Sequence, residues 1–104
     1  MTTYEILYTP EAREDIRAIY TYIAFDLQMP DTAKRQVDRI REEICELDIF
    51  PERYEQVDWE PWRSMDMRRL PVDRFVVFYC IREQIVEIVR IFYGGRDIEA
   101  LIKE

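Results

Sequence analysis

Arginine is the residue type whose number and placement in this chain could do chemistry. Residues 61–96 hold seven arginines, at positions 63, 68, 69, 74, 82, 90 and 96, against four acids, which gives a local charge of +3. Arginine binds phosphate or carboxylate oxygens in pairs through its planar fork of donors. The window therefore predicts an anion site, for a nucleic-acid phosphate or for the acids of a protein partner. At its end, Tyr93 is a candidate proton donor, and Gly94-Gly95 should give the backbone freedom to turn.

The rest of the composition excludes several kinds of enzyme. The chain has no histidine and two cysteines, so Ser-His-Asp and Cys-His catalysis cannot be assembled within it, and a zinc site is not expected. Neither GxxxxGK[ST] nor GxGxxG occurs, and we predict no cofactor and no metal. Residues 1–60 carry 15 acids against 7 bases, and the net charge of −7 argues against non-specific binding of nucleic acid.

The hydropathy pattern indicates a soluble, cytoplasmic protein without membrane contact. No apolar run approaches the roughly 20 residues of a membrane span, and no signal peptide opens the chain. Cys45 and Cys80 both fall on apolar faces of expected elements. They are therefore predicted to be reduced thiols in the core, not a disulfide.

Two helices should form an antiparallel hairpin in the first half of the chain. Residues 4–8 read as a short strand, after which Thr9 caps a helix whose apolar residues recur every three or four positions to Leu27. Pro30 is expected to end this helix and Asp31 to cap a second one. A connection this short makes the two helices neighbours.

Three strands and a short helix are expected in the second half. The strands cover residues 67–72, 75–81 and 85–93, joined by hairpin-length connections, and Trp59 and Trp62 should anchor the loop before them. The chain is thus predicted to be one α+β domain over residues 1–104. Its order would be β-α-α-β-β-β-(α), with the N-terminal helical hairpin packed on a small, mainly antiparallel sheet.

Strand alternation assigns the candidate residues to faces of the sheet. In the last strand, Val86, Ile88, Arg90 and Phe92 should point one way, and Glu87, Val89, Ile91 and Tyr93 the other. Arg68 and Arg69 are neighbours, so they should face opposite sides, and one should join Arg90 or Arg96. The face away from the helices is mostly apolar, which indicates contact with a partner chain. The alternative is a solvated face on which the arginines pair with local acids.

Several short segments occur in a fixed order along the chain. They are Tyr8-Thr9-Pro10-Glu11-Ala12 and Asp15-Ile16, then Phe50-Pro51, then Arg68-Arg69-Leu70-Pro71-Val72, Phe75-Val76-Val77-Phe78-Tyr79 and Ile88-Val89-Arg90-Ile91, and finally Tyr93-Gly94-Gly95-Arg96-Asp97-Ile98. In this order and spacing, the chain resembles the RelE/ParE superfamily of type II toxin-antitoxin toxins over nearly its full length. The fold that this resemblance implies agrees with the one expected from periodicity.

The resemblance implies one of two activities. RelE-like members are ribosome-dependent endoribonucleases that cut mRNA without metal, whereas ParE-like members share the fold and poison DNA gyrase. Arg69 and Arg96 fall at positions where the nucleases keep basic residues, but two other such positions hold Met67 and Val76. The terminal tyrosine of the nucleases falls near Ile102.

These losses favour a ParE-like, non-nucleolytic toxin. Attack by a 2′-hydroxyl needs a base, an acid and charge stabilisation, each worth about 10²–10⁴ in rate. Arginine is a poor base because it stays protonated at neutral pH. The alternative is a RelE-like mRNA interferase in which Arg69, Arg96 and Tyr93 would be catalytic.

The resemblance also implies a partner, a RelB- or ParD-like cognate antitoxin. Such antitoxins wind a disordered or helical C-terminal segment around the toxin and bind operator DNA with their other end, so the toxin would meet DNA only within the hetero-oligomer. We expect acidic side chains of that segment, or the target, to bind Arg68, Arg69, Arg90, Arg96 and Tyr93. A third hypothesis is an inactive relic that only binds antitoxin, whose expression would leave growth unaffected.

Overall fold

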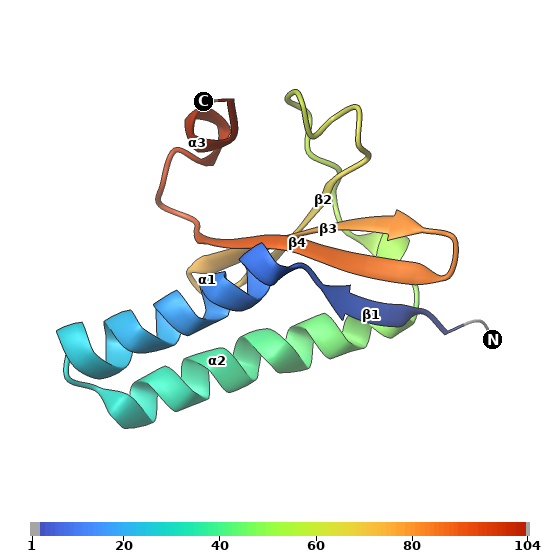
Figure 1. Cartoon of the computed structure of the whole chain (residues 1–104). Coiled ribbons are helices and arrows are strands. Elements are labelled where there is room, and N and C mark those ends of the chain that lie inside the picture. Colours follow the sequence, from blue (N-terminus) through green and yellow to red (C-terminus); the bar gives the residue numbers. More distant parts are fainter. Residues whose placement is uncertain (1–2, 104) are drawn as a thin grey trace.

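Four strands form one mixed sheet in a computed structural model that describes residues 3–103 (Figure 1). They are β1 (Glu5–Tyr8), β2 (Arg68–Val72), β3 (Phe75–Arg82) and β4 (Ile85–Tyr93), in the spatial order β1-β4-β3-β2. β1 runs parallel to β4, whereas β2, β3 and β4 form an antiparallel meander. Helices α1 and α2 cover one face of the sheet (Figure 1). The predicted α+β class, element order and helical hairpin are confirmed.

α1 (Pro10–Thr21) begins as the sequence predicts. The Thr9 hydroxyl accepts a hydrogen bond from Ala12 N–H at 3.0 Å, and a proline occupies the first helical position. The helix changes its winding before the expected end, because Tyr22–Asp26 form a π-helical turn. This wider turn leaves Leu27 47% exposed instead of on the apolar stripe.

α2 (Pro30–Cys45) begins at the proline that was expected to end the preceding helix, so that prediction is wrong. A proline fits the first helical position because its missing N–H would have no partner there. Asp31 is not the cap either. Met29 precedes the helix without a side-chain cap, and Asp31 lies in the first turn, where its charge favours the helix dipole.

The helical layer and the sheet enclose the main hydrophobic core. Ile16 of α1 and Ile40 and Ile44 of α2 are buried against Tyr79 of β3 and Ile88 of β4. Each buried aliphatic side chain of this kind contributes about 2 kcal/mol. This burial fixes both helices against the sheet.

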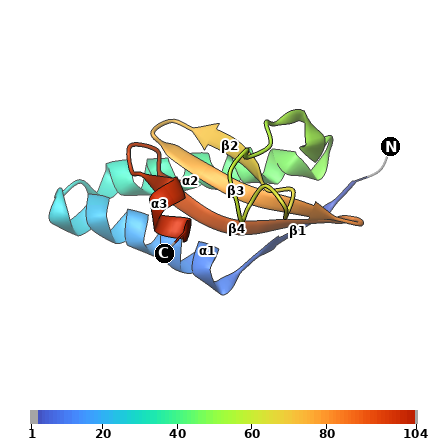
Figure 2. The same ribbon diagram turned by 90° about the horizontal axis from the view of Figure 1, so that it is seen from above.

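The chain's own loop and last helix cover the opposite face of the sheet. Helix α3 (Ile98–Lys103) and the loop before β2 both lie on that side (Figure 1, Figure 2). Trp62 is buried against Phe78 with ring centroids 4.6 Å apart, and Trp59 stacks on Trp62 at 5.1 Å. Ile98 joins the same cluster. The tryptophans anchor a loop as predicted, and this cover accounts for apolar residues that had indicated a partner chain.

A β-bulge in β4 changes which residues share a face. The pairing with β3 passes from Ile88 directly to Arg90, so Val89 has no partner on β3. Ile88 and Ile91 both belong to the helix-side core, although an odd number of steps separates them. The predicted strict alternation is therefore wrong beyond Ile88, because one inserted residue reverses the pattern. Arg90 lies opposite Phe78, on the face away from the helices.

Candidate functional site

Arg90, a predicted anion-binding residue, is held by an acid of α1. Its Nε and Nη2 donate to the carboxylate of Asp15 at 2.8 and 3.0 Å, and Ile91 N–H donates to the same carboxylate at 2.8 Å. The side-chain hydrogen bond to Asp15 raises the pKa of Arg90. The Arg90 guanidinium also lies 4.4 Å from the centroid of the Phe92 ring. A carboxylate or phosphate that binds Arg90 has to compete with Asp15.

Arg68 is also engaged within the chain. It pairs with Tyr79 and faces the helices, whereas Arg69 pairs with Phe78, so the two arginines do point to opposite faces. The Arg68 guanidinium donates to the carbonyls of Glu52 at 2.9 Å and Tyr54 at 2.7 Å. Arg68 therefore holds the loop that follows α2.

The Arg69 and Arg96 guanidinium groups make no hydrogen bond or ion pair within residues 3–103. Arg96 lies 5.9 Å from the centroid of Phe92. Arg69 is opposite Phe78, whose ring centroid is 6.3 Å from that of Phe92. The structure thus brings Arg90 and Arg96 together at one aromatic ring and places Arg69 beside the next ring on the same face.

The tyrosines do not join this arginine cluster. Tyr93 pairs with Phe75 on the helix side of the sheet, their rings packed edge-on at 6.0 Å, and 47% of Tyr93 is exposed. Tyr79 is buried, and its hydroxyl donates to the Pro51 carbonyl at 2.6 Å. Burial raises the pKa of Tyr79, which disfavours its ionised form. Neither hydroxyl shares the face of Arg96.

The two glycines after β4 lie where space is limited and do not use the left-handed backbone region, which corrects the prediction of backbone freedom. Neither glycine has a positive φ. A Cβ on Gly94 would lie 3.3 Å from the Arg74 carbonyl oxygen and 3.3 Å from Val76 Cγ2. A Cβ on Gly95 would lie 2.5 Å from the Tyr93 ring. The close approach of the turn to β3 and to Tyr93 is what needs glycine here.

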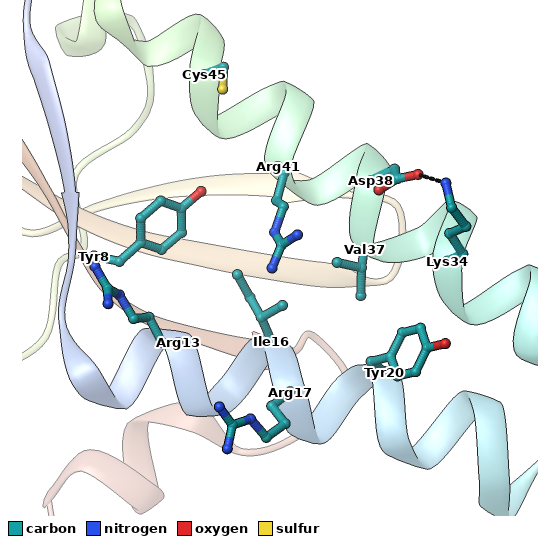
Figure 3. A pocket seen from close by; sticks show the side chains of 10 residues that line it. All are labelled: Tyr8, Arg13, Ile16, Arg17, Tyr20, Lys34, Val37, Asp38, Arg41 and Cys45. Atoms are coloured by element: carbon teal, nitrogen blue, oxygen red, sulfur yellow. Dashed lines mark hydrogen bonds and ion pairs between the residues drawn. The ribbon is translucent and has the colours of Figure 1, made fainter.

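Sequence reasoning missed a groove of about 820 Å³ between α1 and α2 (Figure 3). Four cations line it: Arg13 and Arg17 from α1, and Lys34 and Arg41 from α2. Ile16 and Val37 supply apolar surface in the groove, and Tyr8 and Tyr20 contribute aromatic surface (Figure 3).

Two of the four cations in this groove have no side-chain partner within the described residues, and the other two form only exposed pairs. Lys34 pairs with Asp38, the one acid of the lining, at 3.0 Å. Arg17 lies 3.8 Å from Glu14, and both side chains are largely exposed. Arg13 and Arg41 make no side-chain hydrogen bond or ion pair within the described residues. The groove can therefore accept carboxylates from an amphipathic segment while its apolar surface accepts the other face of that segment.

A spacing signal for this groove exists in the sequence. Arg13 and Arg17 are four residues apart on one helix, and Lys34 and Arg41 are seven apart on the next, so each pair shares a helix face. The signal is hidden because these cations lie within the strongly acidic half of the chain. A charge count over a window averages them with acids that point elsewhere.

Cys45 lines this groove and is exposed, so the prediction that both thiols are in the core is wrong for Cys45. It follows the buried Ile44 at the end of α2, and a one-residue step turns a helical side chain by about 100°, away from the core. Cys80 is buried as predicted, and both thiols are unpaired. Burial raises the pKa of Cys80 and of Tyr8 at the groove.

Among the described residues, no group of three or more His, Cys, Asp or Glu side chains could hold a metal ion. Within the same residues, the helices are too short or too polar to cross a bilayer.

Chains from solved toxin-antitoxin systems share this fold. The chromosomal ParDE system of P. aeruginosa matches with a TM-score of 0.73 and 22% identity, over 88% of this chain and 96% of that chain. The RelBE2 complex of Mycobacterium tuberculosis matches with a TM-score of 0.66 and 18% identity, over 92% and 97%. The archaeal RelE-RelB complex of Pyrococcus horikoshii OT3 matches with a TM-score of 0.61 and 17% identity, over 91% and 99%.

Comparison of the sequence with known protein families identifies the family to which the chain belongs. No match was found among curated proteins. The family model described as the ParE toxin of type II toxin-antitoxin system, parDE, matches residues 6–98. The chain therefore belongs to the ParE family of type II toxin-antitoxin toxins.

Proposed function

We propose that this toxin arrests bacterial growth in the cytoplasm by inhibiting DNA gyrase without cleaving RNA, until a cognate antitoxin neutralises it. The observation that carries the proposal is the separation of the candidate acid-base groups. Tyr93 lies on the helix side of the sheet, whereas Arg96 lies at Phe92 on the other side. Arg90 is already paired with Asp15. Arg69 and Arg96 are available to bind a phosphate on that face, but neither Tyr93 nor Tyr79 lies there to transfer a proton.

The alternative, ribosome-dependent cleavage of mRNA, has one observation in its favour. Arg69 and Arg96 make no side-chain hydrogen bond or ion pair within the described residues and lie on one face of the sheet, an arrangement that suits a phosphate. This alternative requires a group of the mRNA or of the ribosome to act as the acid or base in place of a toxin side chain.

One experiment separates the two activities and the inactive relic. The toxin is expressed briefly without antitoxin, and an abundant mRNA is mapped by primer extension while plasmid supercoiling is measured. We expect intact message, reduced plasmid supercoiling and arrested growth. Discrete cuts in translated message that disappear in Arg69→Ala or Arg96→Ala would establish the nuclease instead. Continued growth with neither effect would establish the relic.

For neutralisation, we propose that an acidic, amphipathic helical segment of the antitoxin occupies the groove between α1 and α2. The support is the match between four lining cations with one acid and a partly apolar surface. Arg69 and Arg96 remain candidates for a second contact on the opposite face. An antitoxin segment that winds around the toxin could reach both. Arg68, Arg90 and Tyr93 are less suited to this role, because the first two are engaged and the third packs on Phe75.

A further inference from the structure

Phe50 combines an exposed aromatic ring with an unfavourable backbone conformation. It is 74% exposed, and its φ of 52° and ψ of 53° lie in the left-handed region. A bulky side chain rarely adopts this region, because its Cβ crowds the backbone. Proline at position 51 adds to the cost, since a residue before proline prefers extended conformations. The other non-glycine residues with positive φ within the described part of the chain are all polar: Gln28, Asp66, Asp73 and Glu83.

Neighbouring side chains lock the loop that carries Phe50. Three of them satisfy its backbone carbonyls. Arg53 donates to the carbonyls of Glu46, Ile49 and Phe50 at 3.3, 2.6 and 3.0 Å. The Tyr79 hydroxyl donates to the Pro51 carbonyl at 2.6 Å. Arg68 donates to the carbonyls of Glu52 and Tyr54 at 2.9 and 2.7 Å. A strained residue persists only where its surroundings over-determine it, and such residues cluster at functional sites. Here the lock keeps an aromatic ring pointing into solvent.

The charge around Phe50 selects the kind of partner. Glu46, Asp48 and Glu52 all lie within four residues of Phe50, and the two bases on this loop, Arg53 and Arg68, are turned to the carbonyls. An acidic border repels nucleic-acid phosphates and repels an acidic antitoxin segment. It attracts a protein surface that carries lysine or arginine.

Resting on the proposed function, we infer that Phe50 is the anchor through which the toxin binds its protein target. The ring enters an apolar socket that basic side chains border on the target. Aromatic anchors at the centre of interfaces dominate binding energies, and an anchor held in place before binding loses little entropy. This role explains why three other side chains hold the loop that carries a strained, exposed phenylalanine.

Phe50→Gly tests the inference cleanly, because glycine adopts the left-handed region without strain. We expect the melting temperature to stay equal or rise. We expect the affinity for purified DNA gyrase, measured by fluorescence anisotropy of the labelled toxin, to fall by about 30-fold or more. Growth arrest should be lost in parallel, while antitoxin affinity stays unchanged. Phe50→Tyr keeps the ring and should keep both gyrase binding and growth arrest.

Phe25→Ser is the matched control, because Phe25 is a 69% exposed aromatic residue in the π-helical turn, far along the chain from Phe50. It should bind gyrase like the wild type. Equal gyrase binding by Phe50→Gly and the wild type would overturn the inference and leave the gyrase proposal standing. Loss of antitoxin binding in Phe50→Gly with gyrase binding intact would overturn it as well. A wild-type toxin that cuts message and does not bind gyrase would overturn both proposals.

Discussion

The two cationic regions of the molecule differ in what their charges already contact. On the sheet, Arg68 is bonded to two backbone carbonyls and Arg90 to the carboxylate of Asp15, so only Arg69 and Arg96 of the four candidate arginines lack a side-chain partner within the described residues. In the groove between the helices, Arg13 and Arg41 contact no acid within the described residues. The sheet arginines come from the basic window of the sequence, and the groove cations come from its acidic half.

The difference shows that a count of arginines does not measure the charge available to a partner. A guanidinium that is hydrogen-bonded inside the fold contributes to stability, and a ligand has to displace its partner before binding. An unpaired guanidinium at the edge of an apolar groove is available at once. Substitutions in the groove should therefore change binding, and substitutions around Arg90 should change stability.

Charge reversal in the groove should have the largest effect. We expect the double substitution Arg13→Glu and Arg41→Glu to weaken binding of the cognate antitoxin by about 100-fold, with the melting temperature nearly unchanged. Calorimetric titration at two salt concentrations measures this. Alkylation of the exposed Cys45 gives a second readout, because antitoxin in the groove should protect that thiol.

Arg35→Glu is the control for this experiment, since Arg35 is an exposed cation of α2 that contacts Thr32 and does not line the groove. Equal losses of antitoxin affinity in Arg35→Glu and in the groove double variant would mean that only net charge matters. Unchanged affinity in the groove variant would place the antitoxin elsewhere.

Removal of Asp15 should reduce stability. In Asp15→Ala, the free energy of unfolding should fall by about 2 kcal/mol, because Arg90 and Ile91 N–H both lose their acceptor. This loss of unfolding free energy is smaller than that expected for a fully buried ion pair, because 33% of the Arg90 side chain is exposed. Urea denaturation measures it, with Glu14→Ala as the control on the same helix. If both variants unfold alike, the pair with Arg90 is not structural.

Tyr79→Phe should have a smaller effect that depends on pH. Loss of the Tyr79 hydroxyl leaves the Pro51 carbonyl without its donor, which should lower the free energy of unfolding by about 1 kcal/mol at neutral pH. The pKa of Tyr79 is raised in the folded protein, so Tyr79 ionises at a lower pH in the unfolded chain than in the folded one. The stability of the wild type should therefore decline as pH rises past about 10. The variant should lose less stability between pH 7.5 and pH 10.5 than the wild type. Parallel denaturation curves with equal pH dependence would contradict this.

Lys34→Gln should have the smallest effect. Lys34 is the groove cation that already pairs with an acid, Asp38, on an exposed helix face, and such pairs add little stability. Its melting temperature should match the wild type, and the loss of antitoxin affinity should be well below that of the Arg13 and Arg41 variant. An equal loss would mean that pairing within the fold does not decide which cations bind.

The sequence predicted the architecture well because hydrophobic periodicity and capping are local. Thr9 starts α1 as expected, and the stripes of both helices form the core. The face assignment of Arg90 required knowledge of the bulge at Val89, which arises from pairing between strands and leaves no mark in the alternation. The ion pair between Arg90 and Asp15 joins residues 75 positions apart, so a single sequence does not reveal it either.

The start of α1 also bears on how the toxin behaves when it is alone. β1 pairs with β4 only as far as Ile88. Beyond that point, the Thr9 N–H and hydroxyl donate to the carbonyls of Ile88 and Val89 on β4 at 2.9 and 2.8 Å. Asp15 accepts a hydrogen bond from Ile91 N–H of the same strand. Open strand edges recruit other chains into growing sheets. At the opposite edge, Arg69 N–H donates to the Glu55 carbonyl at 3.0 Å. The part of β4 beyond β1 and the start of β2 are thus covered by the chain itself at these positions, which leaves less backbone open to strand-to-strand association.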